Sequence, residues 1–138
     1  MAKKKAQKTN AARILDRLGI DYELLTYPVD ENDLSANHVA EVTGIPPERI
    51  YKTLVVRGDR TGVFMAVIPG AGELDLKAAA AASGNKRAEM VHLKEVFELT
   101  GYVRGGCSPL GAKKSYPVYC DESMMQQERI CVSAGRRG

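Results

Sequence analysis

The amino-acid sequence predicts an α+β domain in which helices surround a mixed β-sheet, and two observations predict it. Two apolar, β-branched segments, residues 50–56 and 64–68, are separated by a polar turn, which indicates a hairpin in the core of a sheet. Helical patterns lie on both sides of this hairpin in the sequence, at 10–18 and 75–83. Hairpins mixed with helical crossovers are typical of a mixed sheet and not of a purely parallel α/β design.

The N-terminal segment predicts a helix followed by a strand. Apolar side chains recur at helical spacing over 10–18, Thr9 or Asn10 can cap the first turn, and Gly19 can end the helix. Residues 22–27 then predict a strand.

A polar loop at 28–33 leads to a second predicted helix. Ser35 can accept the hydrogen bonds of the first turn, and Gly44 can end the helix. The apolar residues expected to face inward are Ala36, Val39 and Ala40.

The alanine-rich segment 75–83 predicts a further helix, because alanine is the strongest helix former and is small enough to pack closely on a sheet. Gly84 is expected to end it. The remaining predicted elements are a strand at 86–91, a helix at 94–100, and strands at 102–104, 117–120 and 129–133.

Length and composition indicate a single domain. A chain of 138 residues has the size of one domain, and it buries about two thirds of its unfolded surface. Apolar residues at 44 % and charged residues at 27 % exclude a disordered or fibrous chain. We expect residues 1–8 to form a flexible basic tail and residues 9–138 to form the domain. Since no apolar run is long enough for a membrane span and no signal peptide is present, we expect a cytoplasmic protein without a membrane partner.

Positive charge gathers at three places, in residues 1–8, 113–114 and 136–137, although the net charge is only +3. Clustered cations can attract phosphate groups independently of nucleotide sequence. A solvated chain end is the alternative interpretation of the N-terminal lysines, and charge alone leaves both open.

The cysteines give no sign of a structural bridge or of a metal site. Cys107, Cys120 and Cys131 form no CxxC pair, and the chain has only two histidines. We therefore expect reduced thiols, no metal and no cofactor.

Residues 101–111 hold four glycines and a proline, a composition that neither a helix nor an interior strand tolerates. Glycine serves where φ must be positive or where a group must approach the main chain closely. We therefore expect a loop shaped for a ligand. The alternative is a tight connection between two sheet edges, which would need only one or two glycines.

Lys52, in the predicted strand 50–56, is the single residue that is most informative about function. In an alternating strand it shares a face with Leu54 and Val56, so its ammonium group points to the apolar side. A buried unpaired charge costs several kcal/mol, of order 5. Lys52 must therefore meet an acidic partner, reach solvent at the end of the strand, or line a cavity that holds an anion.

Five segments, read together, resemble the YbaK/EbsC family. They are, in chain order, 9–13 (TNAAR), 51–56 (YKTLVV), 67–69 with 74–77 (VIP and LDLK), the glycine loop at 101–114, and 132–138 (VSAGRRG). The match spans almost the whole chain, and five motifs in the same order make chance agreement improbable. The resemblance implies a mixed, barrel-like sheet surrounded by helices.

Members of this family are aminoacyl-tRNA deacylases related to the editing domain of bacterial prolyl-tRNA synthetases. The resemblance implies a trans-editing hydrolase that removes cysteine from mischarged Cys-tRNA(Pro). The expected partner is the acceptor end of aminoacyl-tRNA, with prolyl-tRNA synthetase as a further candidate. Two alternatives stay open: a deacylase of the same superfamily that is selective for alanyl-tRNA(Pro), and a noncatalytic tRNA-binding module. The oligomeric state is not determined by the sequence.

The resemblance also implies the site residues. Lys52 and Gly105 are the expected catalytic residues, with Lys52 binding the terminal phosphate or ribose and the main-chain N–H groups of the loop facing the ester. The expected substrate-binding residues are Tyr27, Thr53, Gly106, Ser108, Pro109 and Ser133. Without the resemblance, Thr53 would be a strand former, Tyr27 a sheet-edge aromatic and Ser133 a turn residue.

No side chain is an evident nucleophile. Ser/His/Asp and Cys/His arrangements need a base beside the nucleophile, and nothing in the sequence links His38 or His92 to the glycine loop, so we expect both on the surface. Cys107 lies inside the loop but has no apparent base, and we expect a spectator thiol. The resemblance implies instead that the substrate cysteine attacks its own ester carbonyl and expels the tRNA hydroxyl.

Two departures from the family pattern qualify the resemblance. Relatives usually continue past the Gly-Arg-Arg-Gly motif with another strand and a helix, so we expect the domain to lack these elements, as a truncated or a naturally short form. The segment 31–37 matches poorly, and no site residue is carried over from it.

Overall fold

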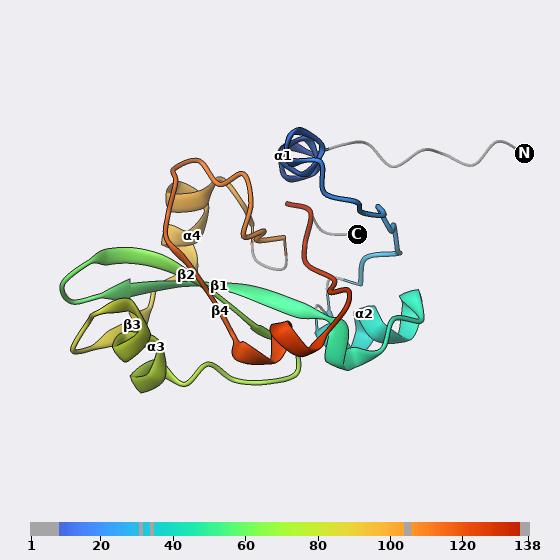
Figure 1. Ribbon diagram of the computed structural model, residues 1–138. Helices are drawn as coiled ribbons and strands as arrows, with labels where there is room; N and C mark the ends of the chain where they lie inside the picture. Colours follow the sequence, from blue (N-terminus) through green and yellow to red (C-terminus); the bar gives the residue numbers. More distant parts are fainter. Residues whose placement is uncertain (1–8, 31, 34, 104–105, 136–138) are drawn as a thin grey trace, which may run out of the picture.

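The structure is a computed structural model that describes residues 9–30, 32–33, 35–103 and 106–135. The centre of the fold is a long β-hairpin (Figure 1). Strand β1 (Tyr51–Gly58) pairs with β2 (Gly62–Pro69) in antiparallel register from one end to the other. Strand β3 (Ala88–Met90) pairs antiparallel with β1, and β4 (Val118–Cys120) pairs parallel with β2. The order β3-β1-β2-β4 makes a mixed sheet, as the sequence predicts.

In the sequence, helices precede and follow the hairpin. They are α1 (Asn10–Leu18), α2 (Ala36–Thr43), α3 (Leu76–Ser83), α4 (Leu93–Thr100) and two short 3₁₀ helices, Pro47–Arg49 and Glu122–Gln126. Each α-helix ends at a glycine with positive φ, and the predicted caps Thr9 and Ser35 accept main-chain N–H bonds in the first turn, as does Asp75 at the start of α3. The predicted helices are therefore confirmed. In the described part of the chain, none of them has the length and apolar character that crossing a membrane requires.

The hairpin is covered on both faces, because its side chains alternate. Val56, Phe64 and Ala66 form one buried cluster with Ala79 of α3. Val55 forms a second cluster on the other face, and α4 contributes its buried residue there. Figure 1 shows α3 and α4 on opposite sides of the two long strands. The hairpin therefore forms the core of the molecule, as predicted from its uninterrupted apolar character.

The side chain of Asn85 holds the turn of the hairpin in place through hydrogen bonds of both its oxygen and its nitrogen. The Asn85 side-chain oxygen accepts the N–H groups of Arg60 and Thr61 at 2.8 and 2.9 Å. Its amide nitrogen donates to the hydroxyl groups of Thr61 and Ser83, at 2.8 Å each. A Cβ atom on Gly58 would lie 2.2 Å from this amide nitrogen, so only glycine fits beside it.

Three of the predicted strands are corrected by the structure. Residues 22–27 form no strand, and neither do Tyr102 and Val103, while Arg104 lies outside the described residues. The predicted strand at 129–133 is reduced to a single parallel bridge between Ile50 and Cys131. Alternating side chains make a strand only where a neighbour offers a free edge, and apart from the bridge at Cys131 these segments pair with no strand among the described residues.

The expected barrel-like closure is also wrong, because the sheet is open. Among the described residues, β3 and β4 stand at its two edges and do not pair with each other. Each edge strand has only three residues, so neither extends far enough to curl the sheet on itself.

Candidate functional site

A cleft of about 1860 Å³ runs past one end of β1. Its walls come from α1, the segment that follows it, α2, the glycine loop and the segment before the C-terminus. Of the eight candidate residues, the ones that line this cleft are Tyr27, Lys52, Thr53, Ser108, Pro109 and Ser133. Gly105 lies outside the described residues, and Gly106 is buried and does not line the cleft.

Lys52 and Thr53 are neighbours on β1, and strand alternation places them on opposite faces. Lys52 shares its face with Leu54 and lies opposite Ile68. Thr53 shares its face with Val55, which packs towards α4. Because all four residues of β1 from 52 to 55 line the cleft, the cleft reaches both faces of the strand at this end.

Lys52 is half-buried, and its ammonium group has no ion pair with any described carboxylate. The sequence allows three environments for this ammonium group, and the first of them, pairing with an acidic side chain, is not found among the described residues. Its position at the cleft leaves it available to an anionic ligand.

Thr53 is only 7 % exposed, and its hydroxyl has no hydrogen-bond partner among the described residues. A buried hydroxyl without a partner costs about 1–3 kcal/mol. Native structures seldom keep such a group unless a ligand, a water or a function accounts for it. Thr53 is therefore the described residue whose surroundings point most directly to a bound molecule.

The glycine loop is shaped by its own hydrogen bonds. The Gly106 N–H donates to the Val103 carbonyl at 2.9 Å, so this particular donor is occupied within the loop. Ser108 is fully buried, and its hydroxyl oxygen accepts the Leu110 N–H at 3.2 Å. Lys113 donates its N–H to the Thr100 carbonyl at 2.9 Å, which ties the end of the loop to α4.

Tyr27 and Ser133 lie on other walls of the cleft. Tyr27 is half-buried in the segment between α1 and α2. The Ser133 hydroxyl oxygen accepts the Gly135 N–H at 3.2 Å, as expected for a serine in a turn. The Ser133 hydroxyl keeps its own hydrogen to donate, so this turn role does not exclude a contact with a ligand.

Cys107 is poorly suited to act as a nucleophile. Burial raises the pKa of its thiol, and a hydrogen bond with the Thr100 side chain offsets this only in part. The thiolate is the nucleophilic form, so a raised pKa leaves little of it at neutral pH. This agrees with the expectation of a spectator thiol.

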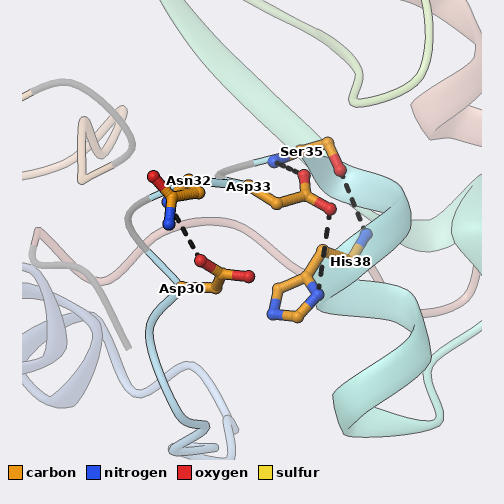
Figure 2. Close-up of polar contacts among 5 residues, drawn as sticks. All are labelled: Asp30, Asn32, Asp33, Ser35 and His38. Carbon is orange, nitrogen blue, oxygen red and sulfur yellow. Dashed lines mark hydrogen bonds and ion pairs between the residues drawn. The ribbon is translucent and has the colours of Figure 1, made fainter.

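The start of α2 brings a histidine into the cleft wall, which the sequence did not predict. Figure 2 shows His38 and Asp33 facing each other, with the imidazole Nδ1 4.0 Å from the carboxylate. Hydrogen bonds from the Ser35 side chain and main chain lower the pKa of Asp33, and His38 adds a smaller effect. The His38 side chain is only 19 % exposed, so the predicted surface position is wrong, whereas His92 is exposed as predicted.

The spacing of these residues carried a usable signal. Ser35 caps the helix and accepts the His38 N–H at 3.2 Å, so residues 35 and 38 lie together in the first turn. His38 therefore adjoins Val39, which was expected to face inward and is half-buried in the cleft wall, while no residue of α2 is fully buried. The poor motif match of this segment hid the arrangement.

Metal ligation has no candidate cluster in the described part of the chain. There, no group of three or more histidine, cysteine, aspartate or glutamate side chains is placed to hold an ion.

Comparison with known proteins gives the class of this fold and site. A solved structure described as a "putative trans-editing enzyme for prolyl tRNA synthetase" superposes with a TM-score of 0.77 and 25 % identity, covering 95 % of this chain and 83 % of that one. The sequence profile of the aminoacyl-tRNA editing domain matches residues 30–138, and the chain belongs to that family.

Two relatives are similar in sequence. The "Putative Cys-tRNA(Pro)/Cys-tRNA(Cys) deacylase EbsC" of Enterococcus faecalis (strain ATCC 700802 / V583) is 53 % identical over 100 % of this chain and 85 % of its own length. The "Proline--tRNA ligase" of Thermosipho africanus (strain TCF52B) is 35 % identical over 60 % of this chain and 15 % of its own length. The resemblance to the YbaK/EbsC family is thereby confirmed.

Proposed function

We propose that this chain is a trans-acting hydrolase that removes cysteine from mischarged Cys-tRNA(Pro). The observation that supports it most is one cleft that gathers six of the eight candidate residues, in a chain 53 % identical to a protein named as a Cys-tRNA deacylase. The acceptor end of the tRNA would enter this cleft with the ester between β1 and the glycine loop.

Lys52 would bind the negatively charged end of the tRNA. Its ammonium group has no described anionic partner and lies at the cleft, so a phosphate or a ribose oxygen of the terminal nucleotide can pair with it. The unpartnered Thr53 hydroxyl would bond to the aminoacyl ester from the other face of the strand. Tyr27, Ser108, Pro109 and Ser133 complete the proposed contacts.

The proposed nucleophile is the thiol of the substrate. Its sulfur forms a bond to the ester carbonyl carbon, the bond from that carbon to the tRNA oxygen breaks, and the thiol proton ends on the tRNA hydroxyl. Water then opens the cyclic thioester and releases cysteine. A thiol with a pKa of about 8.5 is a few per cent ionised at neutral pH and is a strong nucleophile.

Gly105 would help at this step. Main-chain donors of the glycine loop would stabilise the negative charge that develops on the carbonyl oxygen, an effect of about 3–4 kcal/mol per donor in well-studied sites. Because the Gly106 N–H is already bonded to Val103, the donors we propose are those of its neighbours in the loop.

The function is tested by deacylation of Cys-tRNA(Pro) with Lys52→Ala and with Lys77→Ala as a matched control. Lys77 is an exposed lysine of α3 outside the cleft. We expect Lys52→Ala to lower kcat/KM by about 100-fold, the effect of losing one charged contact to the substrate, and Lys77→Ala to leave it unchanged. Equal kcat/KM values for both variants would show that Lys52 does not bind the substrate. A wild-type protein that does not cleave Cys-tRNA(Pro) would refute the proposed deacylase activity.

A panel of esters separates the alternatives. A cysteinyl ester cleaved far faster than alanyl and seryl esters on the same tRNA supports attack by the substrate thiol, because serine ionises too weakly and alanine has no such group. Preference for the alanyl ester would favour the alanine-selective deacylase. Salt-sensitive tRNA binding without cleavage of any ester would favour the noncatalytic module.

We further propose that the protein works in the cytoplasm and alongside a prolyl-tRNA synthetase. The similarity of part of a proline–tRNA ligase to this chain supports such a pairing. Co-sedimentation with the synthetase in the presence and absence of tRNA tests it. Sedimentation of each protein at its own rate under both conditions would contradict the pairing.

A further inference from the structure

Tyr102 lies between two segments of the cleft wall. Its hydroxyl donates to the main-chain carbonyl of Leu110 at 2.5 Å. A Cβ atom on Gly111 would come within 3.0 Å of that hydroxyl, and a Cβ atom on Gly135 would lie 2.8 Å from Cε1 of the ring. Both glycines have positive φ, 73° and 102°. One aromatic side chain therefore touches the glycine loop on one side and the segment before the C-terminus on the other.

The core helix α4 holds Tyr102 in this place. Its N–H donates to the Thr100 hydroxyl oxygen at 3.0 Å. Thr100 is only 1 % exposed, and its hydroxyl donates in turn to the Val96 carbonyl at 2.7 Å. The main chain of Tyr102 is thus anchored to α4, so the packing of the core determines where its ring lies.

The two segments that Tyr102 touches carry proposed substrate contacts, and each is shaped locally. In the glycine loop, Ser108 accepts the Leu110 N–H, and in the C-terminal segment, Ser133 accepts the Gly135 N–H, both at 3.2 Å. These bonds close each turn, but they do not join one segment to the other.

We infer that Tyr102 is a positioning residue of the editing site, which sets the distance between the glycine loop and the segment that carries Ser133. This inference rests on the proposed function. Reacting groups must stay aligned closely, and a displacement of about 1 Å can lower a rate by about 100-fold. Burial raises the pKa of Tyr102, and the neighbouring Cys107 raises it further, so the hydroxyl stays a neutral donor at working pH.

The kinetic test compares Tyr102→Phe and Tyr102→Leu with Tyr116→Phe. Tyr116 is a matched control because its hydroxyl also donates to a carbonyl of α4, that of Leu99 at 2.6 Å, yet no atom of it is among those that crowd Gly111 or Gly135. On Cys-tRNA(Pro) we expect kcat to fall about tenfold in Tyr102→Phe and about 100-fold in Tyr102→Leu, with KM changed less than about threefold. Tyr116→Phe should keep the wild-type kcat.

Hydrogen exchange provides a readout that does not need activity. In Tyr102→Leu, amides of residues 106–111 and of residues 131–135 should exchange about tenfold faster, while Tyr116→Phe should leave both unchanged. Equal kcat values for Tyr102→Phe and Tyr116→Phe, or faster exchange in only one of the two segments, would overturn the inference. A wild-type protein that cleaves no aminoacyl ester refutes the proposed function instead, and the exchange data still report whether Tyr102 couples the segments.

Discussion

At the residue scale, the Thr53 hydroxyl is expected to contribute to ligand binding and not to the stability of the fold. Its hydroxyl is buried and unpartnered among the described residues, so the folded protein gains nothing from it without a ligand. Most buried polar groups, in contrast, have a hydrogen-bond partner in the folded protein. Thr100, on the same side of the molecule, is buried with its hydroxyl bonded twice.

Replacing Thr53 by valine is expected to stabilise the protein and to weaken the substrate complex. Valine has nearly the same shape and removes the unsatisfied group, so the free energy of unfolding should rise by about 1 kcal/mol. The KM for Cys-tRNA(Pro) should rise about tenfold with loss of one hydrogen bond. Urea unfolding and steady-state deacylation measure the two effects.

Thr100→Val is the control for this substitution. Because both bonds of the Thr100 hydroxyl are lost, we expect a decrease in stability of about 1–3 kcal/mol. A Thr53→Val protein that is also less stable would mean that its hydroxyl has a structural partner.

Single residues were predictable where chemistry constrains them, and not where tertiary position does. Alternation in a strand was enough to mark Lys52 as an ammonium group on an apolar face. His38 was misjudged because the sequence does not show which face of a short helix meets a cleft. Local bonding of the Gly106 N–H was likewise invisible, since glycine composition predicts a loop and not its hydrogen bonds.

At the scale of elements, the turn of the β1–β2 hairpin is the most tightly specified part of the chain. Asn85 makes its contacts from beyond α3, and the neighbouring Asp59 carboxylate accepts the N–H groups of Lys86 and Arg87 at 3.0 and 3.1 Å. The turn is thus connected to the strand that follows α3 in the sequence.

We expect Gly58→Ala to lower the free energy of unfolding by about 1–3 kcal/mol, as overpacking does. The new methyl group would lie 2.2 Å from the Asn85 amide, which is buried and bonded on both sides. Gly72→Ala is a matched control, because its Cβ would lie no closer than 3.4 Å to another atom. Urea unfolding of both variants checks this, and equal stabilities would show that Asn85 can move away.

The acid stability of the protein should depend on Asp59. Hydrogen bonds from the N–H groups of Arg87 and then Lys86 hold the pKa of this carboxyl below its ordinary value of 3.8. A lowered pKa in the folded state stabilises the fold above about pH 4, and the stabilisation disappears as the pH falls through the lowered value. Asp59→Asn should therefore be less stable at neutral pH and should lose less stability than wild type between about pH 5 and pH 2.

Helices were easier to predict than strands for a physical reason. A helix is bounded by local signals, and Ser35 with Gly44 marked both ends of α2, while Gly84 marked the end of α3. A strand exists only with a partner, and the segment 22–27 has none among the described residues. The long hairpin was predictable because both of its strands lie close together in the sequence.

At the scale of the whole molecule, tRNA affinity should depend on salt. Lys113 and Lys114 are exposed and can pair with phosphates, and the sequence holds further positive charge in residues 1–8 and 136–137, although the net charge is only +3. If about two phosphates are contacted, raising the salt from about 50 to 200 mM should weaken binding by about tenfold. Filter binding at several salt concentrations measures the slope. A flat response would exclude these clusters from the interface.

The closure of the sheet could not be derived from the sequence. Whether short edge strands meet depends on their length and on the twist of the sheet, and both β3 and β4 were predicted longer than they are. Family resemblance supplied the barrel-like expectation, and the open order β3-β1-β2-β4 replaces it.

The parallel pairing of β4 with β2 has a consequence for the order of folding. The hairpin joins neighbouring stretches of chain and can form early, whereas Met65 meets Val118 only after the intervening chain, with its loop, has been brought round. Refolding should therefore produce an early species with the β1–β2 pair protected from exchange but no hydrolytic activity. Competence towards tRNA would emerge late, when the last edge docks.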